Sequence, residues 1–160
     1  MNINKIREDF FPITKSYKFL DTANHSPPCL PVQEAIRGYL LDWDRLDRRG
    51  DLRTLESIES WAKLVGCSPD EACYQPNTSA GLSVVAETLR LKRGDNVIIN
   101  DLENPANQIP WLAQQSKGVE IRIIRGKGGY VHLEDVEKAI DDDTKVIAIS
   151  GVIKYSSITP

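Results

Sequence analysis

The chain has 160 residues, of which 41% are hydrophobic and 27% are charged, as in ordinary globular domains. This composition excludes intrinsic disorder, and the length suits one domain that folds around a single core. The net charge of −3 provides no basic surface for a polyanion, so neither nucleic acid nor an anionic membrane is an expected partner.

The N-terminal residues and the cysteines indicate a reduced, cytoplasmic protein. Charges recur every few positions in the first fifteen residues, which leaves no apolar run of signal-peptide or membrane-helix length. Cys29, Cys67 and Cys73 are odd in number and lack metal-binding spacing, and His25 and His132 lie far apart. We therefore expect a cytoplasmic chain with no disulfide framework and no metal site.

The first half of the chain is predicted to contain an irregular arm followed by two helices. Residues 1–30 are dense in proline and turn-forming residues, which favours the arm. From Val32 to about Arg45, apolar residues recur at intervals of three and four, as on one helix face. A second helix, capped by Gly66, has an apolar face formed by Leu55, Ile58, Ala62 and Val65.

After Pro69, short apolar runs alternate with helical segments, which is the pattern of a parallel sheet with crossover helices. Strands are predicted at residues 72–75, 96–100, 119–125 and 145–150. The helical stripes between them are Leu82, Val85, Ala86 and Leu89, then Ile109, Leu112 and Ala113, then Leu133, Val136 and Ile140. The predicted fold class is α/β, a three-layer α/β/α arrangement with a mostly parallel sheet.

Such sheets bind ligands beyond the carboxyl ends of their strands, so the loops at residues 75–81, 100–107 and 150–157 define the expected site. In the first loop, Thr78 and Ser79 open a helix, and their hydroxyls and free backbone N–H groups could hold a phosphate. The simpler alternative is that Asn77 or Thr78 only caps this helix.

The other loops and the arm contain further candidates. Glu103, Asn104 and Asn107 are expected to project from a strand end where a planar ligand could lie. Lys154 follows the last strand and could form a Schiff base, the alternative being an ordinary solvated lysine. In the arm, Asn24 and His25 could reach a substrate, the alternative for the histidine being a surface or structural role.

Taken together, four segments resemble the class V aminotransferase superfamily, the pyridoxal phosphate enzymes that include cysteine desulfurases. They are FLDTANHSPPCLPVQEAI at 19–36, YQPNTSAGLSVVAETL at 74–89, GDNVIINDLENPANQIPWLAQQSKGVEIRII at 94–124 and GGYVHLEDVEKAIDDDTKVIAIS at 128–150. Their order along the chain follows the family pattern, which is more specific than any single motif.

The resemblance implies a site for pyridoxal 5′-phosphate. Thr78 and Ser79 fall where the family holds the cofactor phosphate with paired hydroxyls, and Ala80 falls where the backbone of the third residue contributes. Asn104 falls where many members have a histidine stacked on the pyridine ring. The substrate-bordering positions of the arm are Asn24 and His25, and the region from Gly151 to Lys154 falls near a loop that approaches the cofactor in desulfurase-like members.

The resemblance also implies the organisation of the chain. Residues 1–30 would be an N-terminal arm at the border of the small domain and the active site. Residues 31–160 would be an incomplete, N-terminal part of the large domain of a fold type I pyridoxal phosphate-dependent transferase. The Schiff-base lysine and the acidic partner of the pyridine nitrogen fall on later strands in the family, so no catalytic residue is assigned within this chain.

The resulting hypothesis is the N-terminal portion of a truncated pyridoxal phosphate-dependent enzyme, inactive as an isolated chain. It would act on an amino acid as a class V aminotransferase, desulfurase, lyase or epimerase, as a homodimer or with a complementary C-terminal chain. The alternative is a non-catalytic partner or regulatory module that retains the scaffold. A weaker alternative is a small α/β domain that binds another phosphorylated ligand at Thr78 and Ser79.

Overall fold

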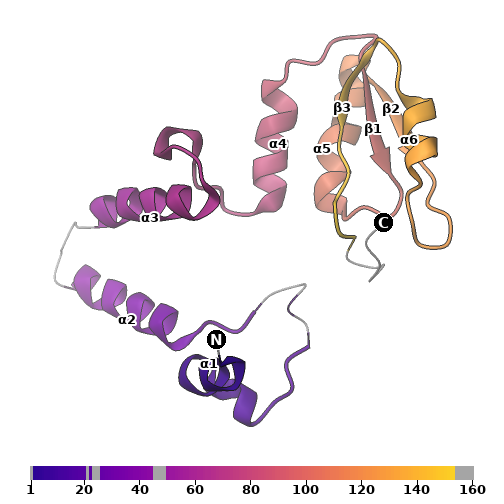
Figure 1. The fold of residues 1–160 in the computed structure, drawn as a ribbon. Helices are drawn as coiled ribbons and strands as arrows, with labels where there is room; N and C mark the ends of the chain where they lie inside the picture. Colours follow the sequence, from indigo (N-terminus) through magenta and orange to yellow (C-terminus); the bar gives the residue numbers. More distant parts are fainter. Residues whose placement is uncertain (1, 21, 23–25, 45–49, 154–160) are drawn as a thin grey trace. The chain divides into compact units, whose positions relative to one another are not determined.

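The computed structural model describes residues 2–20, 22, 26–44 and 50–153. The chain divides into two compact units, Met1–Tyr74 and Gln75–Pro160, which are treated separately below (Figure 1). No helix in the described ranges has both the length and the apolar character that a membrane span requires.

The first unit is helical. It contains α1 (Ile3–Phe10), the 3-10 helix η1 (Pro12–Lys15), α2 (Leu30–Asp44), α3 (Gly50–Val65) and the 3-10 helix η2 (Pro69–Glu71). The two predicted helices are confirmed, and Gly66 ends α3 with a left-handed φ of 77°. The expectation of an irregular segment over residues 1–30 is wrong at α1, which begins because the Asn2 side chain accepts hydrogen bonds from the N–H groups of Asn4 and Lys5.

Much of the apolar surface of α2 and α3 is exposed within this unit. Ile36 and Leu40 of α2 are 53% and 58% exposed, whereas Ala62 of α3 is buried. The helical periodicity therefore predicted the two helices correctly. The apolar faces that it indicated are nevertheless largely exposed in the first unit.

The second unit is a parallel α/β unit. Its elements are α4 (Thr78–Thr88), β1 (Asn96–Asn100), η3 (Pro105–Asn107), α5 (Ile109–Leu112), η4 (Ala113–Lys117), β2 (Glu120–Ile124), α6 (Leu133–Ala139) and β3 (Thr144–Ile147). The strand order is β2-β1-β3, and β1 pairs in parallel with both neighbours. Three of the four predicted strands are thus confirmed.

The predicted strand at residues 72–75 is wrong, because the backbone is extended at Ala72 but the segment pairs with no strand in the described part of the chain. Its apolar residues do not form a buried run: Tyr74 is 59% exposed and its hydroxyl donates to Ser57 Oγ at 2.6 Å. An extended backbone without a pairing edge does not become a strand.

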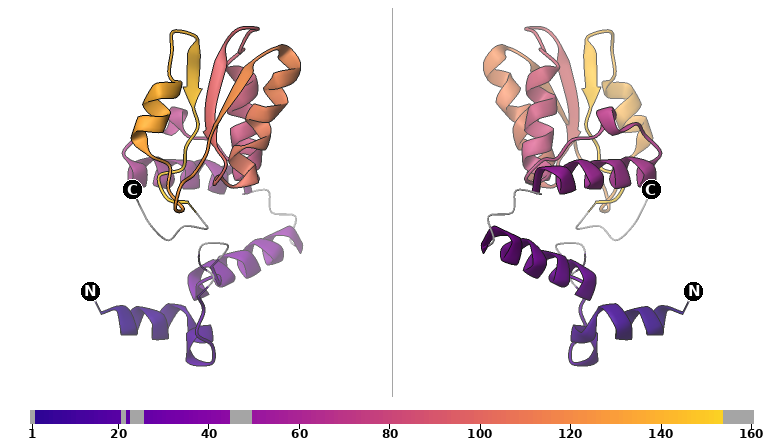
Figure 2. Two further views of the ribbon diagram at one scale, coloured as in Figure 1. Left: turned by 90° about the vertical axis from the view of Figure 1, so that its right-hand side faces the viewer. Right: turned by 90° about the vertical axis from the view of Figure 1, so that its left-hand side faces the viewer.

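The sheet is covered by helices on both faces because the side chains of β1 alternate between two cores. Val97 and Ile99 pack with Ala86 of α4 and Trp111 of α5 on one face. Ile98 packs with Ile124 of β2 and Val136 of α6 on the opposite face. Figure 2 shows the same arrangement, with the strands between α6 and the pair α4 and α5. The predicted three-layer α/β fold class is confirmed for this unit.

Candidate functional site

The N-terminus of α4 provides the hydroxyl pair that the sequence singled out. Asn77 has an extended backbone, and its side-chain oxygen accepts a hydrogen bond from the N–H of Ala80 at 2.9 Å. The Asn77 carbonyl accepts from the N–H of Gly81 at 3.1 Å. Thr78 and Ser79 follow this cap as the first two helical residues, and both are exposed.

The first two residues of α4 provide donor groups of the kind that bind a phosphate. The first N–H groups of a helix have no partner within the helix, so Thr78 and Ser79 can each offer a backbone donor as well as a hydroxyl donor. Ala80 differs, because its N–H already donates to Asn77. The Asn77 cap is therefore confirmed, and because it uses the N–H of Ala80, it leaves the N–H groups of Thr78 and Ser79 available for the predicted role.

The loop after β1 presents Asn104 at the surface. Its backbone is extended, and its side-chain oxygen accepts from the N–H of Ala106 at 2.9 Å, which caps η3. Pro105 begins that short helix, as expected for a residue without a backbone N–H. The side chain of Asn104 is exposed, so its amide nitrogen can face a ligand.

The fold brings these two loops to one end of the second unit. Helix α4 runs opposite to β1, so its N-terminus lies at the end where β1 stops (Figure 1), and α4 contacts η3. Thr78, Ser79 and Asn104 therefore belong to the same end of the sheet. Asn24, His25 and Lys154 lie outside the described residues.

Glu103 was expected to project toward a ligand, and this is wrong. Its side chain is only 5% exposed. One carboxylate oxygen accepts from Asn100 Nδ2 at 3.0 Å and from the N–H of Ser150 at 2.5 Å, and the other accepts from Ser150 Oγ at 2.6 Å. The carboxylate is oriented into the protein because three donors, one from Asn100 and two from Ser150, bind it there.

The surroundings of Glu103 favour its ionised form. Burial acts to raise the pKa of the Glu103 carboxyl, but the hydrogen bonds from Ser150, Asn100 and Asn107 outweigh burial and lower that pKa below its ordinary value. The Asn107 oxygen in turn accepts from Trp111 Nε1 at 3.2 Å. The sequence signal that could have revealed this network is the polar set Asn100, Glu103 and Asn107 directly after a strand of five buried residues.

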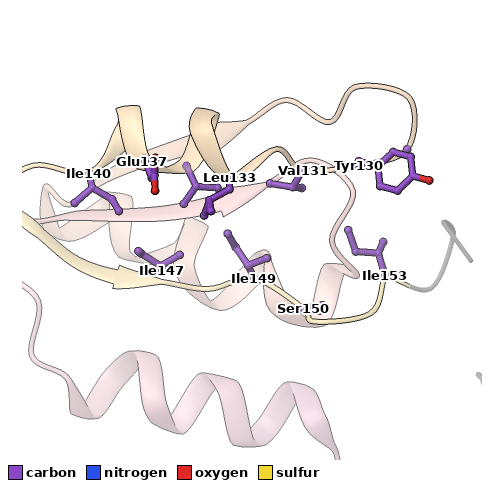
Figure 3. Close-up of a pocket in the computed structure, with 11 residues that line it drawn as sticks. Tyr130, Val131, Leu133, Glu137, Ile140, Ile147, Ile149, Ser150 and Ile153 are labelled. Carbon is purple, nitrogen blue, oxygen red and sulfur yellow. The ribbon is translucent and has the colours of Figure 1, made fainter. Parts of the chain in front are cut away.

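A separate pocket lies between α6 and β3. It has a volume of about 620 Å³, and Figure 3 shows apolar side chains from α6 and from the β3 segment facing each other across it. The pocket has few polar groups and no positive charge among its lining residues, so it does not suit a phosphate. The lining residues are Gly129, Tyr130, Val131, Leu133, Val136, Glu137, Ile140, Ile147, Ile149, Ser150 and Ile153.

The described residues contain neither a cluster of metal-binding side chains nor a disulfide. No group of three or more His, Cys, Asp or Glu side chains is gathered there for a metal ion. Cys29, Cys67 and Cys73 are all free thiols.

The second unit is thus a parallel α/β unit with two adjacent hydroxyl side chains at the N-terminus of α4, at the carboxyl end of β1. The sequence model of the Aminotransferase class-V family matches residues 19–156. The chain therefore belongs to the class V aminotransferase family, which confirms the resemblance found in the sequence.

Individual relatives agree with this assignment. A probable cysteine desulfurase of Methanothermobacter thermautotrophicus is 29% identical over 161 residues, covering 95% of this chain and 40% of the relative. A cysteine desulfurase of Salmonella dublin is 34% identical over 169 residues, covering 94% of this chain and 42% of the relative.

The fold is also that of a solved structure. The apo cysteine desulfurase of Thermococcus onnurineus NA1 matches with a TM-score of 0.79 at 26% identity, covering 94% of this chain and 40% of that protein. The chain thus spans about 40% of the length of the cysteine desulfurases that it matches.

Proposed function

We propose that the chain is the N-terminal portion of a pyridoxal 5′-phosphate-dependent enzyme that acts on an amino acid. The observation that carries this proposal is the exposed hydroxyl pair of Thr78 and Ser79 at the N-terminus of α4, in a chain of the class V aminotransferase family. Two hydroxyls, two open backbone N–H groups and the positive end of a helix dipole together suit a dianionic phosphate.

The chain's own residues would bind and orient the cofactor. Thr78 and Ser79 would hold its phosphate. The N–H of Ala80, which donates to Asn77, would contribute by dividing its hydrogen bond between Asn77 and the phosphate. Asn104 would lie beside the ring and offer its amide, without the aromatic face that a histidine would provide. When bound, the cofactor supplies an electron sink for bonds at the substrate's α-carbon.

Turnover is proposed to need groups that this chain does not provide. The resemblance places the lysine that bonds covalently to the cofactor, and the acid that faces its ring nitrogen, on strands that come later than those described here. A complementary C-terminal chain would supply these two groups, whereas a homodimer partner with the same sequence would not. Asn24 and His25 would border the amino-acid substrate.

A binding titration tests the cofactor assignment. We expect pyridoxal phosphate to bind the wild-type chain more tightly than pyridoxal, which lacks the phosphate. A T78V/S79A variant should bind pyridoxal phosphate about tenfold or more weakly, because each hydrogen bond to a charged group is worth roughly 1.5–3 kcal/mol. Ser83→Ala is the matched control, since Ser83 is also exposed on α4 but lies beyond its first turn.

Three outcomes would contradict the assignment. Equal affinity for pyridoxal phosphate and pyridoxal would remove the phosphate site, and an S83A effect as large as that of T78V/S79A would make the loss non-specific. Equal protection from heat by unrelated phosphorylated compounds would favour a general phosphate-binding domain instead.

A non-catalytic binding module is the second candidate, and the apolar pocket between α6 and β3 favours it. Ile147 and Leu133 line this pocket and are 47% and 68% exposed, as expected of a surface that a protein partner covers. The module predicts binding of an apolar dye such as ANS that Ile147→Asp abolishes, with no effect of T78V/S79A. A monomer that binds no dye would count against it.

A further inference from the structure

The loops after β1 and after β3 are joined by side chains rather than by the sheet. The backbone ladder between the two strands ends with the N–H of Ala148 donating to the carbonyl of Ile98 at 2.9 Å. Beyond this point, Glu103 accepts both from the backbone and from the side chain of Ser150, which lies 47 positions later in the sequence. One carboxylate thus continues the connection where the strand pairing stops.

The same carboxylate also organises its own loop. Asn100, at the end of β1, donates to Glu103 at 3.0 Å, and the Asn107 side chain in η3 contributes to lowering the pKa of the Glu103 carboxyl. The Asn107 amide is itself held by the indole of Trp111, a side chain that is 2% exposed in the core. Glu103 therefore links the buried core, the segment that begins with Asn104, and the start of the loop after β3.

We infer that Glu103 is a positioning residue that holds the loop bearing Asn104 against residues 150–153, so that these two walls at the carboxyl end of the sheet keep a fixed relation. Glu103 does not touch a ligand, because its side chain is buried and both of its oxygens are occupied by donors from the protein. The identity of the ligand between the two walls rests on the proposed function. The link between them through Glu103 does not, because it is made by hydrogen bonds within the chain.

The neighbouring carboxylate on this loop offers a matched control. Asp101 accepts from the N–H of Gly126 at 2.7 Å and from Arg125 at 3.3 Å, so it joins the loop to the segment after β2. Asp101 and Glu103 thus carry the same charge on one loop but connect it to opposite edges of the sheet. Their removal should disturb different segments.

Amide hydrogen exchange, measured residue by residue by NMR, tests the link. In Glu103→Ala, the N–H of Ser150 and the capped amides of Ala106 and Asn107 should exchange at least about tenfold faster, the effect of losing a hydrogen bond to a charged group. Glu103→Gln should restore much of the protection, since its amide oxygen still accepts from the Ser150 N–H. Asp101→Ala should instead accelerate exchange at Gly126.

A second variant covers the case in which E103A fails to fold. Ser150→Ala removes the hydroxyl that donates to Glu103 but leaves the carboxylate in place. It should accelerate exchange at Ala106 and Asn107, across the link, without affecting Gly126. Unchanged exchange at Ala106 and Asn107 in S150A, or a D101A effect at Ser150 as large as that of E103A, would overturn the inference.

The affinity for pyridoxal phosphate separates this inference from the proposed function. If the wild-type chain binds the cofactor, E103A should weaken binding about tenfold, with E103Q and D101A close to wild type. If the wild-type chain does not bind it, the proposed function fails, while the exchange data alone still decide whether Glu103 joins the two loops. Normal affinity in a folded E103A variant would overturn the positioning role.

Discussion

Replacing Ile98 by alanine should destabilise the second unit far more than the same change at Ile123. Ile98 is fully buried in the central strand between Ile124 and Val136, whereas Ile123 in β2 is 42% exposed. Ile98→Ala removes three buried carbons at about 0.8 kcal/mol each, or roughly 2.4 kcal/mol, and the cavity left behind raises the loss to about 3–4 kcal/mol. Ile123→Ala should cost about 1 kcal/mol, because its carbons already contact water.

Urea unfolding followed through the indole NMR signal of Trp111 measures this difference within the second unit. With an m-value of about 2 kcal/mol per molar, Ile98→Ala should lower the midpoint by roughly 1.5–2 M and Ile123→Ala by about 0.5 M. Both variants make the same substitution in a parallel strand, so the comparison reports the burial of Ile98 in the central strand against that of Ile123 in the edge strand β2. Equal losses in the two variants would refute the assignment of Ile98 to a closed core.

Four further predictions concern a helix cap, two glycines and a buried acid. Asn77→Ala should cost about 1 kcal/mol and lower the melting temperature by several degrees, because the Ala80 N–H loses its acceptor. In thermal melts, Gly118→Ala should destabilise by about 1–2 kcal/mol, since Gly118 has a φ of 85° and a Cβ would lie 2.9 Å from Arg93 Cγ. Gly38→Ala in α2 should instead stabilise by up to about 1 kcal/mol, because nothing lies within 4 Å of the new Cβ. The pKa of Glu103 is lower in the folded chain than its unfolded-state value of about 4.3, so the ionised carboxylate contributes stability above that pH. This contribution is lost as the pH falls through the folded-state pKa, and the stability curves of wild type and E103Q should converge below it.

In the second unit, the sequence predicted best the strand whose apolar residues are buried in the structure. The run from Asn96 to Asn100 is buried at every position, so its apolar centre indicated a central strand without ambiguity. The strand at residues 144–147 was predicted over a longer range, but backbone pairing stops at Ala148. Strand ends depend on partners elsewhere in the chain, which apolar periodicity does not report.

Two errors share a physical cause, since both involve polar side chains that bond to the backbone. Asn2 starts α1 by accepting from two backbone N–H groups. Ile3, Ile6 and Phe10 recur at intervals of three and four on this helix, a pattern that the interpretation of residues 1–30 as an irregular arm did not use. Glu103 is buried by donors that come from Ser150, and no local pattern reveals a partner 47 positions away. Its sequence position was a good guide to the loop and a poor guide to the direction of the side chain.

The helix cap beside the candidate phosphate site was easier to predict, because its residues are adjacent in the sequence. Asn77, Thr78 and Ser79 are adjacent in sequence, and the cap geometry follows from their residue types and from the helix that begins after them. The additional fact that only the structure supplies is that Asn77 occupies the N–H of Ala80.

The strand order also has a consequence for how the second unit folds. β1 is made first but lies in the middle, and its partners arrive later: Asn96 pairs with Glu120 and then with Thr144, 48 positions after it. The most hydrophobic strand therefore has no partner until the first crossover has been synthesised, and its second edge is unpaired until the second crossover follows. These non-local contacts slow folding. During this interval β1 is the segment most exposed to intermolecular pairing, so the yield of folded chain should depend on protein concentration more than on the final stability of the sheet.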